Sequence, residues 1–592
     1  MNKDKRINWI IAIAVTLVTA LIMGVFFDYF YDLNDDVLIK DILSGAYLGE
    51  PSSRNNQNLW LFGIVVSTMY RILPAVPWYG ILLIVFQYGS MAVILNRSLE
   101  LLKSDVRTLV KVVTAIFEAI ILAVLAFNHL VNIQYTFTVA LMAGAAILWI
   151  IAQNTDCTPK EYLKQSVPSI VIIFVAFNLR SEMMLLMLPY VLVAVLIKFT
   201  FDKSEASATA KVKSAVCRKL IKHGCMLAVI VGSMLIALGI NGMAYSSDDW
   251  RYFTDFFDAR TELYDFQVIP SYEENREFYD SINLSKEEEA LLENYNFGID
   301  DNITSDTIWQ VAGYANQSNP KAADFTTSLK DNLRLYLYRI THDGEAPGSD
   351  YPYNLIGLVL YILPLVLLFR AKRYLGILDI AVLFVGRTLI WIYMMMGNRM
   401  PDRITHSLYF VEMSVLLGFL FWLVGEDLEK ELKEKLLIVP ATCSIVFFGL
   451  IIPNAYRELG REQSQRCEIN AAYEDLYLYA AEHPSNYYMT DVYSTVSYSE
   501  KIFGKAAGID KSNFNTLGGW YTHSPIEALK ESKFNILTQE EGLLEDNVFY
   551  VTDKTRSTAW LTDYYKYKDI EIELDQVEEL GGVFEIYEVN GN

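Results

Sequence analysis

The chain has 592 residues, of which 53% are hydrophobic and 20% are charged, and its mean hydropathy is +0.23. This composition is too apolar for an ordinary soluble protein. Five cysteines without a CxxC pair and six scattered histidines predict neither a disulfide scaffold nor a His-rich metal centre. With a formal net charge of −21, we expect a lipid bilayer and no nucleic acid among the partners.

Apolar blocks recur along the chain at about the 18–22 residues that a helix needs to cross a bilayer core. The first block, 7–30, follows three basic residues and lacks a small-residue cleavage site, which indicates an uncleaved span. The other clear blocks are 78–95, 109–127, 135–152, 166–200, 223–243, 354–370, 375–396, 407–424 and 435–452.

Two segments leave the number of spans open. Block 59–73 is weaker and either crosses the membrane or lies at its surface, while 166–200 forms either one bent crossing or two. Both solutions place the chain ends on the same sides. We predict a mainly α membrane protein, a helical bundle of about 11–13 spans.

The distribution of charge predicts the orientation. Basic residues collect in short connections near residues 3–6, 203–222, 370–373 and 430–435, and such loops mark the cytoplasmic side. By contrast, 244–350 holds 22 acidic and 8 basic residues, and 453–592 holds 25 and 12. We therefore expect a multi-pass plasma-membrane protein with a cytoplasmic N-terminus and both acidic regions on the outer face.

Four parts follow from this reading. They are an N-terminal membrane module (1–243) with a first outer loop (28–58), an inserted outer region (244–352), C-terminal membrane helices (353–452) and an outer domain (453–592). In the inserted region, Ser285 and Glu288 have the spacing of a capping box, which predicts a helix.

The C-terminal region is predicted to be a small α/β domain, because helix-like and strand-like stretches alternate. The expected helices are 464–482, 525–533 and 556–567. The expected strands are Tyr487–Val492, Asn547–Thr552, Ile570–Leu574 and Val583–Val589.

The first outer loop carries the most informative motif, the adjacent carboxylates Asp35 and Asp36. One interpretation is that they are solvated acidic residues at the point where the first helix leaves the membrane. The alternative is that one of them is a general base for an acceptor hydroxyl at the membrane surface. Inside an apolar block, Arg180 would cost at least ~2.5–3.5 kcal/mol to insert unless it faces a cavity or a partner. It marks a polar clamp between helices, a break between two spans, or a binding site.

An acidic pair after the first span, a long outer loop and many further spans resemble the GT-C superfamily of membrane glycosyltransferases. The resemblance is to the bacterial and protein-mannosyltransferase-like branches, which use polyprenyl-phosphate sugars. Segment Asn55–Phe62, running on to Tyr70–Pro74, is similar to their second-helix region. Many members carry Asp-Glu where this chain has Asp35-Asp36, and we favour Asp35 as the base.

The resemblance implies inverting transfer of a sugar from a polyprenyl-phosphate carrier to a cell-surface glycan, lipid or protein. Arginines would hold the leaving phosphate. The candidates are Arg54, Arg399, Arg403 and Arg180, although interfacial arginines also bind lipid headgroups. No cofactor is implied, and a divalent cation in the acidic loop is left open.

Two alternatives to this transferase remain. A polysaccharide polymerase or ligase would not need Asp35 and Asp36, and a transporter or flippase for lipid-linked sugars would perform no covalent chemistry.

Overall fold

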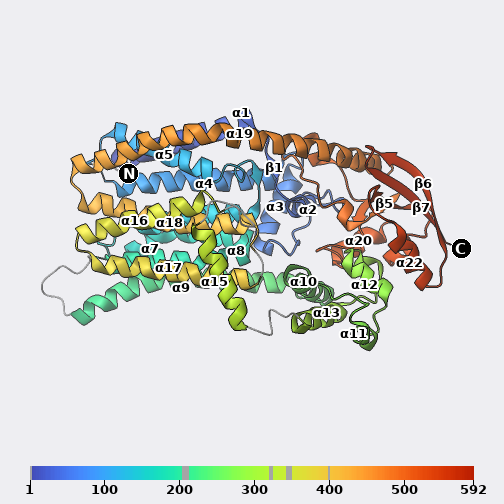
Figure 1. The fold of residues 1–592 in the computed structure, drawn as a ribbon. Helices are drawn as coiled ribbons and strands as arrows, with labels where there is room; N and C mark the ends of the chain where they lie inside the picture. The colour runs from blue at the N-terminus through green and yellow to red at the C-terminus, as the bar shows by residue number, and fades with distance from the viewer. Residues whose placement is uncertain are drawn as a thin grey trace.

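The computed structural model describes residues 3–103, 105–202, 212–318, 325–341, 350–397 and 400–591. Long helices form an elongated bundle, and a β-sheet with short helices lies beyond one end of it (Figure 1). The N-terminus lies in the part of the bundle remote from the sheet, and the C-terminus lies beside the sheet. We call the two ends of the bundle the sheet end and the far end.

Ten described helices are long and apolar enough to cross a membrane, which confirms a multi-span helical protein. They are α1 (Lys3–Phe26), α4 (Trp78–Leu101), α5 (Thr108–Leu125), α6 (Tyr135–Ala152), α7 (Pro159–Leu179), α8 (Ser181–Thr200), α9 (Val212–Ala244), α16 (Tyr353–Arg370), α17 (Tyr374–Met396) and α18 (Asp402–Asp427). The predicted block 435–452 lies within α19 (Lys430–Glu482), and most of its side chains lie outside the described residues.

The lengths of the helices decide between the alternatives left for blocks 59–73 and 166–200. Block 59–73 forms α3 (Trp60–Ile72), whose 13 residues are too few to cross a bilayer core. Block 166–200 is divided between α7 and α8, each long enough to cross. The helix lengths therefore favour the arrangement in which 166–200 crosses twice and 59–73 does not cross.

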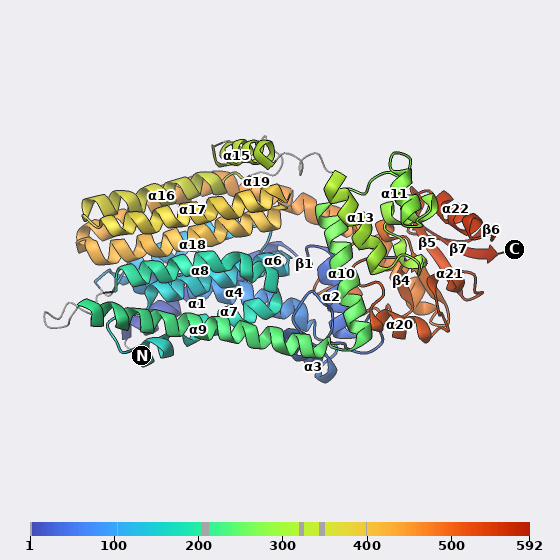
Figure 2. The same cartoon turned by 90° about the horizontal axis from the view of Figure 1, so that it is seen from below.

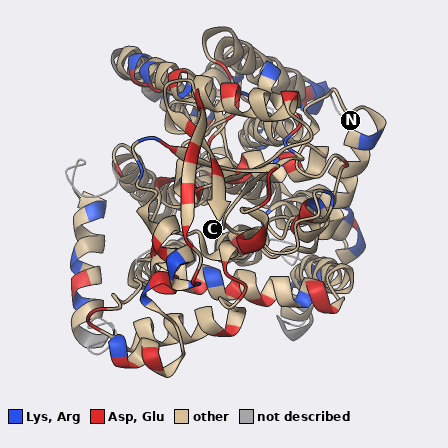
Figure 3. Cartoon of the chain, turned by 90° about the vertical axis from the view of Figure 1, so that its right-hand side faces the viewer, with Lys and Arg blue, Asp and Glu red and all other residues tan. Residues whose placement is uncertain are grey.

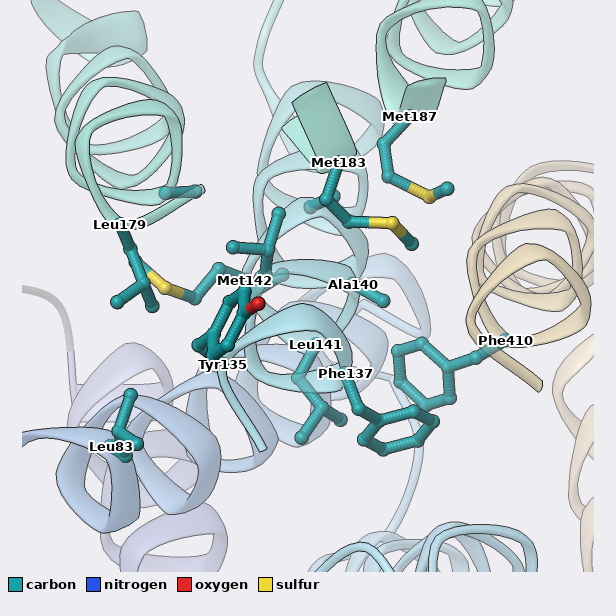
Figure 4. Packing of buried hydrophobic residues seen from close by; sticks show 14 of the residues in the cluster. Leu83, Tyr135, Phe137, Ala140, Leu141, Met142, Leu179, Met183, Met187 and Phe410 are labelled. Atoms are coloured by element: carbon teal, nitrogen blue, oxygen red, sulfur yellow. The ribbon is translucent and has the colours of Figure 1, made fainter. Parts of the chain in front are cut away.

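Helix α6 is the centre of the bundle, because nearly all of its side chains are buried. It packs against α4, α7, α8 and α18. Phe137 and Met142 of α6 lie among Leu83 of α4 and Phe410 of α18 (Figure 4). By contrast, α1 exposes Leu17 and other apolar side chains, as expected for a helix that faces lipid.

The far end of the bundle gathers the basic connections. Lys103 pairs with Glu426 at 2.8 Å, and Lys433 pairs with Asp105 at 2.9 Å. These contacts place the connection after α4 beside the connection between α18 and α19. Arg373 also pairs with Asp427, and Lys5 pairs with Glu100, so the predicted basic segments 3–6, 370–373 and 430–435 share this end of the bundle.

Helix α19 joins the bundle to the sheet. It runs for 53 residues without a break, so the predicted span 435–452 and the predicted helix 464–482 are parts of one helix (Figure 1). The chain then enters a five-stranded sheet of order β4-β3-β5-β7-β6, in which β4, β3 and β5 are parallel and β7 is antiparallel to both neighbours.

The C-terminal region is thus the predicted α/β domain, which we call the sheet domain. Its strands are β3 (Tyr487–Thr490), β4 (Phe514–Thr516), β5 (Val548–Asp553), β6 (Ile572–Leu580) and β7 (Phe584–Gly591), and its helices are α20 (Pro525–Ser532), α21 (Gln539–Gly542) and α22 (Ala559–Tyr567). Strand β4, only three residues long, was not predicted.

The inserted region is helical, as predicted. Its elements are α10 (Asp248–Phe266), α11 (Arg276–Ser281), α12 (Lys286–Glu293), η1 (Phe297–Ile299), α13 (Ser305–Ser318) and α15 (Phe325–Thr341). The Ser285–Glu288 capping box opens α12, with both reciprocal hydrogen bonds present. Helix α15 lies along the side of the bundle, apart from the others (Figure 2).

The inserted region and the sheet domain share one hydrophobic core, so they form a single unit, which we call the outer unit after the side of the membrane predicted for it. Phe256 of α10 and Leu291 of α12 belong to the same buried cluster as Tyr550 of β5. The N–H of Gly298 also donates to the carbonyl of Leu517 at 2.8 Å. Acidic residues are spread over the face that this unit presents away from the bundle (Figure 3).

Candidate functional site

The first outer loop is clamped between the bundle and the sheet domain. Strand β1 (Phe30–Tyr31) pairs in parallel with β2 (Asn132–Ile133), which precedes α6. On its other side, the Tyr31 N–H donates to the carbonyl of Glu500 at 2.9 Å. These bonds fix the point at which the next helix, α2 (Asn34–Ser44), begins.

Helix α2 carries the acidic pair in its first turn, where the positive end of the helix dipole stabilises carboxylates. Two buried ion pairs then hold α2 against the sheet domain. Lys40 contacts Glu500 at 2.8 Å, and Asp41 contacts Lys511 at 2.8 Å. The first turn of α2 is therefore rigidly placed at the sheet end of the bundle.

Asp36 points into the protein. It is fully buried, and it accepts a hydrogen bond of 2.9 Å from the hydroxyl of Tyr79 on α4. Burial raises the pKa of Asp36 well above its usual range, and the charges of Asp35 and Asp32 raise it further. This environment favours the protonated carboxyl, which is a poor proton acceptor.

Asp35 is only partly buried and, among the described residues, forms no ion pair. Two arginines nevertheless respond to its charge. Burial alone would lower the pKa of Arg180, but Tyr135, Glu182 and Asp35 hold it above its ordinary value. At Arg260 of α10, burial again lowers the pKa, but Tyr295, Asp265 and Asp35 together raise it above its ordinary value.

A second group of charged side chains lies around Asp32, just before α2. Arg466 of α19 forms an ion pair of 2.8 Å with Asp32 and also donates to its carbonyl at 2.9 Å. Burial raises the pKa of Asp32 above its usual value, while Arg466 and, more weakly, Arg403 of α18 oppose that rise. The carboxylates at the start of α2 are therefore in the electrostatic field of cationic side chains from four separate parts of the chain, of which Arg466 is in direct contact with Asp32.

The four arginines predicted to bind the donor phosphate differ in location. Arg180 lies in the break between α7 and α8, as one of its predicted readings required, and donates to the Gln57 carbonyl at 3.2 Å. It is therefore at the sheet end, beside the first outer loop. Arg403 begins α18 near Asp32, and Arg399 lies outside the described residues.

Arg54 has a different environment. It donates to the Ala244 carbonyl at 3.1 Å, and its guanidinium lies 5.4 Å from the centroid of the Trp250 ring. These contacts tie the first loop to the junction of α9 and α10 rather than to Asp35.

Sequence reasoning missed Arg260 and Arg466. Arg260 is one of only 8 basic residues in the acidic segment 244–350, and that rarity was a usable signal. Arg466 had no such signal, since α19 brings it to Asp32 across more than 400 residues of sequence. Within the described ranges, no group of three or more His, Cys, Asp or Glu side chains could hold a metal ion.

Two cavities adjoin α2. The first, between α2 and the sheet domain, holds about 820 Å³ of empty space, part of it open to solvent. The second lies against α19 and includes Asp32 and Arg466 in its wall. Asn34 and Tyr498 border both cavities, and Asn34 directly precedes Asp35 in the sequence.

The sequence matches no protein-family model and no curated protein. The structure is similar to that of ArnT from Cupriavidus metallidurans in the apo state, with a TM-score of 0.40 and 11% identity, covering 98% of this chain and 97% of that chain. The form bound to undecaprenyl phosphate gives a TM-score of 0.39 and 11% identity over the same shares. The archaeal oligosaccharyltransferase AglB from Archaeoglobus fulgidus gives a TM-score of 0.37 and 12% identity, covering 92% of this chain and 69% of that chain.

Proposed function

We propose that this chain is a GT-C-type glycosyltransferase of a bacterial plasma membrane. It transfers a sugar from a polyprenyl-phosphate carrier to a cell-surface acceptor on the outer face. The bundle crosses the bilayer with its far end in the cytoplasm and its sheet end outside. The protein-mannosyltransferase-like branch remains the model for its donor.

One observation carries this proposal. Asp35 is partly exposed, forms no ion pair among the described residues and lies at the sheet end of the bundle, where its charge acts on Arg180 and on Arg260. A lipid-linked phosphate must reside at this depth, because its polyprenyl chain occupies the bilayer and its phosphate the interface. Positive charge is needed at the same place, since negative charge develops there as the phosphate leaves.

Every bond and proton in the proposed reaction is accounted for by the donor, the acceptor and the residues named above. Asp35 takes the proton of the acceptor hydroxyl while that oxygen bonds to the anomeric carbon of the donor sugar. The bond between the anomeric carbon and the phosphate oxygen breaks, and its electron pair leaves with the polyprenyl phosphate. Arg180, Arg260 and Arg403 would stabilise that charge, and attack opposite the leaving group inverts the anomeric configuration.

Asp36 has a positioning role in this scheme. Its buried carboxyl anchors the first turn of α2 to Tyr79, so that Asp35 faces the arginines. Arg466 serves similarly, because it fixes the backbone and side chain of Asp32 just before α2.

The proposal is tested with the purified full chain in lipid, radiolabelled polyprenyl-phosphate sugars and cell-envelope acceptor. Transfer of label to acceptor is the expected result. A polymerase or ligase would instead lengthen glycan chains carried on lipid and would tolerate loss of Asp35. Movement of intact lipid-linked sugar across the bilayer without any transfer would contradict the proposal and support a flippase.

A further inference from the structure

The cavity between α2 and the sheet domain is built from two unlike walls. One face of α2 forms the first wall through Asn34, Val37, Leu38 and Asp41, which recur at helical spacing. The sheet domain forms the opposite wall. The cavity is partly open to solvent.

The sheet-domain wall is rich in aromatic rings. Tyr477, Tyr498, Trp520 and Tyr521 line the cavity. Tyr and Trp present an apolar face together with a polar edge, the combination that stacks on a sugar ring and bonds its hydroxyls.

The same wall holds a polar group with no partner. Thr522 is 3% exposed, and its hydroxyl has no hydrogen-bond partner among the described residues. A buried hydroxyl left in this state costs about 1–3 kcal/mol, which a ligand hydroxyl in the cavity would relieve.

The charges around the cavity disfavour an anion. Asp41, Lys511 and Glu527 line it, and the ammonium groups of Lys40 and Lys511 are already held by buried carboxylates. Behind Glu527, Glu531 and Lys530 complete a buried cluster in which Asn515 donates to both carboxyls. Among the described residues that line the cavity, the one cationic side chain, Lys511, is therefore already paired and is not available to a phosphate or a uronic acid.

We propose that this cavity binds a neutral pyranose ring of the acceptor, so that the acceptor is a glycan. The inference rests on the proposed function. Arg180 and Arg403 belong to the bundle, whereas the cavity lies where α2 meets the sheet domain, so donor and acceptor would reach Asp35 from different sides. Asn34, which borders the cavity and precedes Asp35, marks the point where a ring hydroxyl would reach the base.

The test measures binding of methyl glycosides of glucose, mannose, galactose and N-acetylglucosamine to the full chain in nanodiscs by saturation-transfer NMR, with glucuronic acid as the anionic probe. Leu38→Trp fills the cavity from α2, while Leu537→Trp adds the same ring at a site that is 87% exposed in the sheet domain. We expect at least one neutral glycoside to bind wild type and Leu537→Trp equally, and Leu38→Trp to bind it about tenfold or more weakly.

A second variant tests the same site in case Leu38→Trp fails to fold. Thr522→Val keeps the side-chain shape but removes the hydroxyl, and should weaken binding about threefold to tenfold. The inference is overturned if no neutral glycoside binds, if Leu38→Trp binds as wild type does, or if glucuronic acid binds as tightly.

Asp35→Asn separates this inference from the proposed function. It should abolish transfer and leave glycoside binding unchanged. If Asp35→Asn transfers normally while Leu38→Trp still loses the glycoside, the proposed function fails and the sugar site stands.

Discussion

At the scale of single residues, Arg260 and Arg251 offer a matched comparison on one helix. Both lie on α10, but Arg260 responds to the charge of Asp35 whereas Arg251 is exposed to solvent. Arg260→Gln should weaken binding of polyprenyl phosphate about tenfold to a hundredfold, the effect of losing a charge-assisted hydrogen bond.

The measurement is a titration of each variant with polyprenyl phosphate in nanodiscs. Arg251→Gln should bind as wild type does. Equal affinities of the two variants for polyprenyl phosphate would show that Arg260 does not bind the phosphate. Matching melting temperatures would show that the loss is not one of folding.

His523 gives the sheet domain a specific pH dependence. Burial lowers the pKa of His523 to about 4, against about 6.5 for an unfolded chain. Between these values the unfolded chain binds more protons, so stability falls as the pH falls from about 6.5 to about 4, by up to about 3 kcal/mol.

His523→Asn should remove that component, and Asn accepts the left-handed backbone found here, with φ 62°. Melting temperatures at pH 6.5 and 4.5 test this, because the acid shift should be smaller in the variant. An identical shift in both proteins would contradict it.

At the scale of elements, the contact between the sheet domain and η1 depends on a glycine. A Cβ at Gly518 would clash with the carbonyl oxygen of Tyr295, whereas one at Gly508 would meet open space. Gly518→Ala should therefore lower stability by about 1–3 kcal/mol, the usual cost of overpacking.

Thermal melting and limited proteolysis of the outer unit would measure this effect. Gly508→Ala is the control within the same domain and should melt close to wild type. If both variants melt alike, the packing between the inserted region and the sheet domain does not depend on that close approach.

Hydrophobic length predicted most of the bundle, because each span must be about 20 residues and apolar. It could not decide block 59–73, since α3 is apolar but stops at 13 residues, before Leu73 and Pro74. Nor could it reveal that α19 is one unbroken helix of 53 residues, because its apolar and polar halves have the patterns of two separate helices. The shared core of the two outer regions depends on tertiary contacts that no local pattern encodes.

The candidate site was partly predictable for a similar reason. Asp35 and Asp36 stood out because they follow the first span, but the sequence could not distinguish them. Their difference arises from Tyr79 and burial, which take Asp36 into the protein and leave Asp35 partly exposed. The arginines that act electrostatically on the start of α2 come from four separate parts of the chain, and of these only Arg180 and Arg403 were anticipated.

At the scale of the whole molecule, two cysteines report the orientation in the membrane. Cys467 is exposed on α19 at the sheet end, and Cys157 is partly exposed in the loop between α6 and α7 at the far end. In single-cysteine variants, a membrane-impermeant maleimide should label Cys467 in intact cells. Cys157 should react only after the cells are permeabilised. The reverse pattern would place the sheet domain in the cytoplasm.

The account as a whole depends on Asp35 acting as the base. The most direct test compares transfer of radiolabelled sugar by wild type, Asp35→Asn and Asp36→Asn in lipid. Asp35→Asn should lose about 100-fold or more of the rate, the usual contribution of a general base. Asp36→Asn should stay within about tenfold, because its amide oxygen can still accept from Tyr79 and burial already favours a neutral group. Transfer by Asp35→Asn at the wild-type rate, with both variants folded, would contradict the account.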